Sequence, residues 1–213
     1  MPAPLLAQSK KVGRPRAFDR DVALNRALET FWKSGYEPTS VAELCKAMKI
    51  NSPSLYLSFG NKAQLFLEAV EHYENRYWSE PWQILEAEPD IRLAVEKFLD
   101  ASAVILTSPE TPFGCVVVLS ATNVSPDSIE VDNRLRELRE VTRTKLIARF
   151  KRALKEKDLP DGSSAEALAG VFTAVLQGMS IQARDGASRA QLDAIAHTSL
   201  QLLPNSRTLS KQS

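Results

Sequence analysis

The sequence predicts an all-α protein whose N-terminal part is a three-helix domain with a helix-turn-helix. Apolar side chains recur at intervals of three and four residues along most of the 213-residue chain, which is the spacing of amphipathic helices. Residues 40–59 have the pattern of two short helices joined by a tight turn. Only residues 113–119 are rich enough in β-branched side chains for a strand, and no second strand is available to pair with them.

The first helix is expected from about Asp19 to Lys33, and Gly35 ends it. Its apolar face consists of Leu24, Ala27, Leu28 and Phe31. Residues 1–17 contain several Lys and Arg, few large apolar side chains, and Gly and Pro as helix breakers. We therefore expect them to form a flexible basic arm.

The helix-turn-helix is predicted from capping signals. Ser40 is a suitable N-cap, and Glu43 completes a capping box with it. The apolar pattern breaks at residues 49–51, and a second helix is then expected to start with Ser52 as its cap and Pro53 in its first position. The second helix of such a motif can enter the major groove of DNA.

The rest of the chain is also expected to be helical. Asn61 caps a helix that starts at Lys62 and ends at Trp78, before Pro81. Further helices are expected over about 90–106, 126–158, 164–184 and 188–203, with a short buried helix at 113–119 and a turn at 160–162. Pro204 stops the last helix, and residues 205–213 form a polar tail.

Charge is distributed unevenly along the chain. Residues 1–62 contain ten Lys or Arg and five Asp or Glu, whereas the whole chain has a formal net charge of only +1. A basic half that includes the helix-turn-helix suits a phosphate-binding domain joined to a domain that does not bind DNA. The two cysteines, Cys45 and Cys115, lie far apart, and the chain has neither a signal peptide nor a membrane-length apolar run, so we expect a cytoplasmic protein.

Catalytic signatures are missing from the sequence. The two histidines, His72 and His197, fall on separate predicted helices, and no cluster has the spacing of metal ligands. The sequence contains no nucleophile elbow and no glycine-rich phosphate loop. We therefore expect neither an enzyme nor a bound metal or cofactor.

Residues 27–36, 39–41 and 54–62 resemble the DNA-binding domain of the TetR family of bacterial repressors, and the Leu-Tyr-x-x-Phe-x-x-Lys run at 55–62 is part of that pattern. The similarity covers about residues 18–66. It implies a homodimeric repressor that binds a near-palindromic double-stranded DNA operator and is released by a small-molecule effector. Residues 67–204 would then bind the effector and dimerise through the last two helices. Lys49 stands where the family usually has Gly, so either the turn is relaxed or Lys49 gains a phosphate contact.

Candidate DNA contacts lie on this motif and on the preceding arm. Tyr56, like its counterpart in the family, is expected to bind a phosphate, with packing against the first helix as the alternative; Lys62 is expected to bind one at a helix N-terminus. The other candidates are the phosphate donors Thr39, Ser40 and Ser52, the base-facing residues Asn51, Ser54 and Leu57, and the arm residues Arg14 and Arg16. The arm could instead be a solubilising tail. With no Arg or Gln on the short second helix, DNA shape is expected to contribute to specificity.

The resemblance also implies an effector cavity in the second half of the chain. Candidate lining residues are Phe98, Ser102, Phe113, Cys115, Leu119, Phe172, Leu176 and Gln177, although each would also suit an ordinary core. Gln177 is the most informative, because an amide within an apolar stripe needs a partner. A thiol or electrophile sensor acting through Cys115 is the alternative. A helical interaction protein without DNA binding is a third hypothesis, which the basic N-terminal half disfavours.

Overall fold

The computed structural model describes residues 18–120 and 124–204. Every regular element within these ranges is helical, as the sequence predicts. In chain order they are α1 (Arg20–Ser34), α2 (Val41–Met48), α3 (Ser52–Phe59), α4 (Lys62–Tyr73), the π-helical turn η1 (Glu74–Trp78), α5 (Ser79–Ala87), α6 (Ile91–Leu106), α7 (Val116–Leu119), the 3-10 turn η3 (Pro126–Ser128), α8 (Ile129–Lys155), α9 (Ala165–Arg184), α10 (Arg189–Ser199) and the 3-10 turn η4 (Leu200–Leu202).

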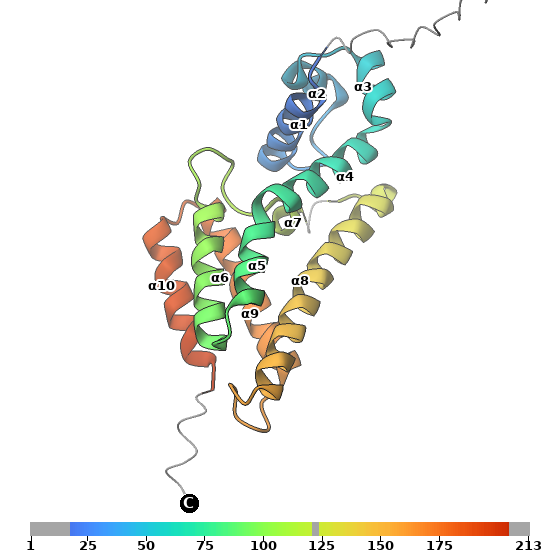
Figure 1. Ribbon diagram of the computed structural model, residues 1–213. Coiled ribbons are helices and arrows are strands. Elements are labelled where there is room, and N and C mark those ends of the chain that lie inside the picture. The colour runs from blue at the N-terminus through green and yellow to red at the C-terminus, as the bar shows by residue number, and fades with distance from the viewer. Residues whose placement is uncertain (1–17, 121–123, 205–213) are drawn as a thin grey trace, which may run out of the picture.

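The molecule is elongated. Helices α1–α3 gather at one end, and α5, α6, α8, α9 and α10 form a bundle at the other end (Figure 1). Helix α4 runs from the first group to the second, so the boundary predicted at residue 66 lies inside a helix that both groups share.

Local capping and a small aromatic core define the N-terminal domain. The predicted capping box of Ser40 and Glu43 is present at α2, and Asn61 caps α4 as expected. The predicted apolar face of α1 is buried. At its centre Phe31 packs edge-on against Phe66 of α4, with ring centroids 5.0 Å apart. This packing holds the helix-turn-helix on the start of α4.

The turn between α2 and α3 differs from the prediction at its second cap. Asn51, not Ser52, caps α3, because its side-chain oxygen accepts the N–H of Ser54 at 2.9 Å. Ser52 and Pro53 are then the first two residues of the helix. Lys49 adopts a left-handed conformation with φ of 58°, so the alternative of a relaxed turn is wrong.

The helix that begins at Lys62 does not end at Trp78. Its backbone continues through η1 into α5, and Pro81 lies in the first turn of α5 rather than beyond a helix end. A proline in a first turn leaves few hydrogen bonds unmade, and the wider π turn before it changes the backbone spacing. The chain therefore bends between α4 and α5 instead of stopping (Figure 1).

The remaining helices form close to their predicted positions. Asp90, Ser164 and Ser188 cap α6, α9 and α10 through their side chains. Residues 113–119 contain the predicted short helix only at Val116–Leu119. The long helix α8 begins after a 3-10 turn at Pro126–Ser128 and ends at Lys155, slightly before the expected end.

Candidate DNA-binding surface and effector cavity

The exposed face of α3 carries side chains with few contacts to the rest of the protein. Leu57 is 89% exposed and Tyr56 is 52% exposed, although both side chains are large. Leu55 and Phe59, on the opposite face, are buried in the core. The fold therefore presents an aliphatic and a phenolic side chain on one accessible helix face, which suits apolar and hydrogen-bonding contacts in a DNA groove.

Polar candidates around this helix have different environments. Ser40, Asn51 and Ser52 are exposed at the starts of α2 and α3. The Ser40 hydroxyl accepts the N–H of Glu43 at 3.2 Å and donates to the Glu43 carboxylate at 2.8 Å. The hydroxyl proton is therefore already used within the protein, whereas a simple N-cap would leave it free for a phosphate. Ser54 is partly buried.

Thr39 and Lys62 are bound within the protein. Thr39 is only 1% exposed, and its hydroxyl donates to the carbonyl of Gly35 at 2.6 Å. The Nζ atom of Lys62 donates to the carbonyl of Glu37 at 3.1 Å and lies 4.4 Å from the ring centroid of Tyr36. Both side chains therefore hold the loop between α1 and α2 in place. Arg14 and Arg16 lie outside the described residues.

A cavity of about 30 Å³ lies in the C-terminal bundle beside η1. Three of the predicted effector residues, Cys115, Leu176 and Gln177, line it. Its other lining residues are Glu74, Trp78, Trp82, Leu106, Val117, Val118, Arg139 and Thr142. The structure thus brings Gln177 and Cys115 together, as expected, on a largely apolar wall.

The other five predicted effector residues lie elsewhere. Phe98 and Phe172 are fully buried in ring contacts with Trp82 and Phe150, at centroid distances of 4.6 and 5.7 Å. The buried Ser102 hydroxyl donates to the carbonyl of Phe98, as often happens within helices.

Two of the five lie near the loop that leads to Cys115. Phe113 is 42% exposed, and Leu119 packs close to Gly114. None of these five residues lines the cavity. The prediction was wrong for them because helical spacing alone does not distinguish a core position from a cavity wall.

Sequence reasoning missed the charged residues of the cavity. Glu74 follows Phe66 and Val70 at intervals of four residues and so continues the buried stripe of α4. This spacing could have identified Glu74 as an inward-facing residue. Burial raises the pKa of the Glu74 carboxyl to about 7, against weaker opposing effects of Lys145 and Arg134.

The Cys115 thiol is also poorly suited to ionise. Burial raises its pKa to about 11, and the nearby negative charge of Glu74 adds to this increase. The thiol is therefore protonated at neutral pH, which lowers its nucleophilicity.

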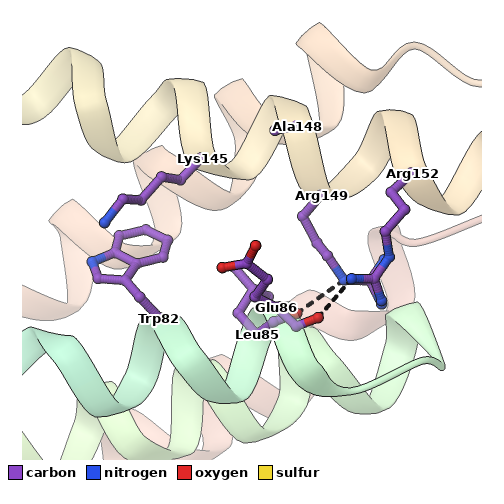
Figure 2. Close-up of a pocket in the computed structure, with 7 residues that line it drawn as sticks. All are labelled: Trp82, Leu85, Glu86, Lys145, Ala148, Arg149 and Arg152. Atoms are coloured by element: carbon purple, nitrogen blue, oxygen red, sulfur yellow. Dashed lines mark hydrogen bonds between the residues drawn. The ribbon is translucent and has the colours of Figure 1, made fainter.

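An open groove of about 200 Å³ lies outside this cavity, between α5 and α8 (Figure 2). Lys145 lies over Trp82 at one end of the groove, with Nζ 4.8 Å from the ring centroid. At the other end, Arg149 donates to the carbonyl of Leu85 (Figure 2). Arg149 also donates to the carbonyl of Glu88. These bonds satisfy carbonyls at the C-terminal end of α5 and fasten α8 to it.

Hydrogen bonds also connect the two ends of the molecule. The indole N–H of Trp32 in α1 donates to the carbonyl of Gly114, next to Cys115, at 3.1 Å. The Glu37 carboxylate accepts the N–H of Ser125 at 2.7 Å. Gly114 has a φ of 82°, and a Cβ there would come within 2.7 Å of a backbone oxygen of α9. The loop at the cavity is thus held tightly between α1 and α9.

An apolar surface remains on the outside of α9. Val171 is 38% and Ile181 is 51% exposed, and the glycines at 170 and 178 have open space around them. Leu200 in η4 is 6% exposed and is buried within its own protomer. Exposed apolar side chains along one helix are typical of an interface.

Within residues 18–120 and 124–204, no helix is both long and apolar enough to span a membrane. Across the same residues, no three or more His, Cys, Asp and Glu side chains lie together as metal ligands.

Comparisons with known proteins agree on one family. The model described as "Bacterial regulatory proteins, tetR family" matches residues 23–69. The HTH-type transcriptional repressor ComR of Escherichia coli (strain K12) is 36% identical over 196 residues, or 92% of this chain and 93% of ComR. The repressor BdcR of the same strain is 28% identical over 89% of this chain and 91% of BdcR. A solved structure of a cysteine mutant of the TetR family transcriptional regulator CifR, complexed with 26-base-pair double-strand operator DNA, is 39% identical, with a TM-score of 0.87 over 90% of this chain and all of that one.

Proposed function

Because the chain belongs to the TetR family of transcriptional regulators, we propose that it is a repressor that binds operator DNA as a homodimer and is released by a small-molecule effector. It acts in the cytoplasm, where bacterial DNA lies. Two copies of α3 enter successive major grooves of a near-palindromic operator. The relatives ComR and BdcR are named repressors, and the CifR structure contains operator DNA.

The exposed face of α3 supports this docking more than any other single feature. Tyr56 and Leu57 project from a helix whose other face is anchored in the core. Asn51 and Ser52 lie at the N-terminal end of the same helix, where free N–H groups favour phosphate. Ser40 and Lys49 extend the surface toward α2, and Lys49 adds a positive charge.

Homodimerisation uses the outer faces of α9 and α10. Val171 and Ile181 expose apolar surface there, and the neighbouring glycines allow close approach of a second helix. A dimer about a two-fold axis presents two recognition helices, which matches a palindromic operator.

Effector binding in the cavity is relayed through α4 and the Gly114 loop. Glu74 and Trp78 of the cavity lie on η1, which directly continues α4. Cys115 follows Gly114, whose carbonyl accepts the Trp32 N–H of α1. A ligand that prefers a different arrangement of these walls shifts the spacing of the two α3 helices and weakens DNA binding.

Titration of labelled upstream DNA tests the repressor function. The full chain should bind one segment near its own gene tightly, with an affinity that falls steeply as salt rises. Equal affinity for that segment and for unrelated duplex DNA would contradict sequence-specific repression.

A thiol sensor acting through Cys115 is the second candidate, because the thiol lines the cavity. Its raised pKa disfavours it. If the cavity binds the effector noncovalently, the Cys115→Ser variant should still dissociate from operator DNA when the effector is added. Loss of release in Cys115→Ser, together with dissociation of the wild-type complex by an oxidant alone, would support the thiol sensor instead.

A further inference from the structure

The effector cavity contains two side chains of opposite charge that lack direct partners. Glu74 and Arg139 both line it. Among the described residues, no hydrogen bond or ion pair reaches the Glu74 carboxylate or the Arg139 guanidinium, and Nη1 of Arg139 is buried without an acceptor. Charges are seldom left unpaired inside proteins, except at sites that bind something.

These two charges do not neutralise each other. Among the described residues, no ion pair or hydrogen bond joins Glu74 to Arg139. The carboxylate and the guanidinium therefore offer a ligand two separate points of attachment. A ligand that satisfies both must carry a donor and an acceptor some distance apart.

Most of the remaining cavity lining is apolar, and part of it is aromatic. The apolar part is formed by Trp78, Trp82, Leu106, Val117, Val118 and Leu176. Flat indole rings favour a ring-shaped ligand body, since stacked or edge-on aromatic contacts add to simple burial. The Gln177 amide supplies one further hydrogen-bonding group on the same wall.

The cavity is too small in this structure to hold an aromatic ligand, and Trp82 is one of its lining residues. A volume of about 30 Å³ has room for water but not for a ring. An outer recess of about 300 Å³ shares Glu74 and Trp82 with the cavity, and the groove in Figure 2 also shares Trp82. Trp82 is partly exposed and lines all three spaces, so a ligand that displaced its indole ring would enlarge the cavity.

We propose that the effector is a compact aromatic molecule with a carboxylate at one end, which binds Arg139, and an amine or hydroxyl at the other, which donates to Glu74. This inference rests on the proposed function of the cavity as the effector site. A bifunctional ligand pairs both cavity charges at once, so it binds more tightly than an analogue that has only one of the two groups. Glu74 lies on η1, so the donor group is bound at the junction of α4 and α5.

Three probes that share one benzene ring test this chemistry on the full-length protein. They are 4-(aminomethyl)benzoate, benzoate without the donor, and benzylamine without the acceptor. Binding is followed by tryptophan fluorescence, since two of the three tryptophans line the cavity. The bifunctional probe should bind the wild type at least about tenfold more tightly than either analogue.

Two variants assign each end of the probe. Glu74→Gln should abolish the preference over benzoate, and Arg139→Gln should abolish the preference over benzylamine. Glu71→Gln on α4 and Arg136→Gln on α8, both exposed, are controls that should keep both preferences. The inference is overturned if the three probes bind equally, if none binds at about millimolar concentration, or if either cavity variant keeps the wild-type preferences.

A separate experiment measures the binding of operator DNA in the presence of each of the three probes. A probe that binds in the predicted order but leaves the DNA complex intact contradicts effector-controlled release, while it supports the ligand chemistry. A probe that releases DNA without any dependence on Glu74 or Arg139 contradicts the ligand chemistry and supports release.

Discussion

At the scale of single residues, Tyr56 is the most exposed phenol next to the predicted DNA surface. We expect Tyr56→Phe to weaken operator binding by about 1 kcal/mol or more, because it removes a hydroxyl contact to phosphate and little else. Fluorescence anisotropy with operator DNA at moderate salt measures the change. An unaltered affinity would contradict the proposed docking of α3.

Lys62 presents a different case, because its Nζ atom already donates to the Glu37 carbonyl. If it also binds phosphate, Lys62→Ala weakens binding by about 1 kcal/mol or more and lowers the salt slope by about one per protomer. Lys155→Ala, at the far end of α8, removes an equal charge as the control. Equal salt slopes for the two variants would show that Lys62 is only structural.

Glu74 links the cavity to stability through its raised pKa. In the folded protein the carboxyl titrates at about 7 instead of 4.5, so folding binds a proton between these pH values. The free energy of unfolding therefore falls as pH rises from about 4.5 to about 7, and the contribution of this carboxyl to that fall reaches about 3 kcal/mol.

We expect Glu74→Gln to remove this pH dependence. The variant should match the wild type below pH 4.5 and exceed its free energy of unfolding by about 3 kcal/mol above pH 7. Denaturant titrations at several pH values, with Glu71→Gln as the exposed control, measure the difference. If the difference in free energy of unfolding between Glu74→Gln and the wild type does not change with pH, the Glu74 carboxyl does not titrate with a raised pKa in the folded protein.

At the scale of helices, the starts were predictable where a single side chain determines them. Asp19, Ser40, Asn61 and Ser188 cap the expected helices, because a cap depends on neighbours in sequence. The end at Trp78 was not predictable in this way. Whether a proline stops or only bends a helix depends on the packing of the segment that follows it.

Helix α9 carries the prediction that concerns assembly. Ile181 is exposed in the protomer, so Ile181→Glu leaves the protomer core intact but brings a charge into the proposed interface. We expect monomers at micromolar concentration in analytical ultracentrifugation. Leu200→Glu is a poorer test, because Leu200 is already buried within its protomer.

Val141→Glu on α8 is the matched control, since Val141 is 46% exposed. It should sediment as the wild type does. A wild-type protein that is monomeric at micromolar concentration would contradict the repressor proposal, because a single half-site offers too little affinity.

At the scale of the whole molecule, the sequence predicted the DNA-binding half in more detail than the cavity. The helix-turn-helix is built from contiguous residues, so its pattern is visible in one dimension. The cavity instead combines η1, α5, α6, α7, α8 and α9, and only Cys115, Leu176 and Gln177 among its lining residues were predicted. Its charged residues Glu74 and Arg139 were missed because charged positions on a helix usually face solvent.

Coupling between the two halves can be tested without the effector. The Trp32 indole N–H bonds to the Gly114 carbonyl, and the same loop begins the cavity wall at Cys115. Because linkage is reciprocal, a cavity that controls DNA binding must itself respond to DNA. Operator binding should therefore change hydrogen exchange at the amides of residues 114–119 in the wild type.

Trp32→Phe should reduce this response while operator affinity without effector stays nearly unchanged. The phenyl ring retains packing against Tyr73, whose ring lies 4.7 Å from that of Trp32, and only the N–H donor is lost. One such hydrogen bond contributes about 0.5–1.5 kcal/mol. The effect of operator on the exchange rates of these amides should therefore be smaller in Trp32→Phe than in the wild type, by up to about tenfold. Amides of α10 are the internal control. If residues 114–119 respond to operator equally in both proteins, the path from cavity to DNA runs through α4 alone.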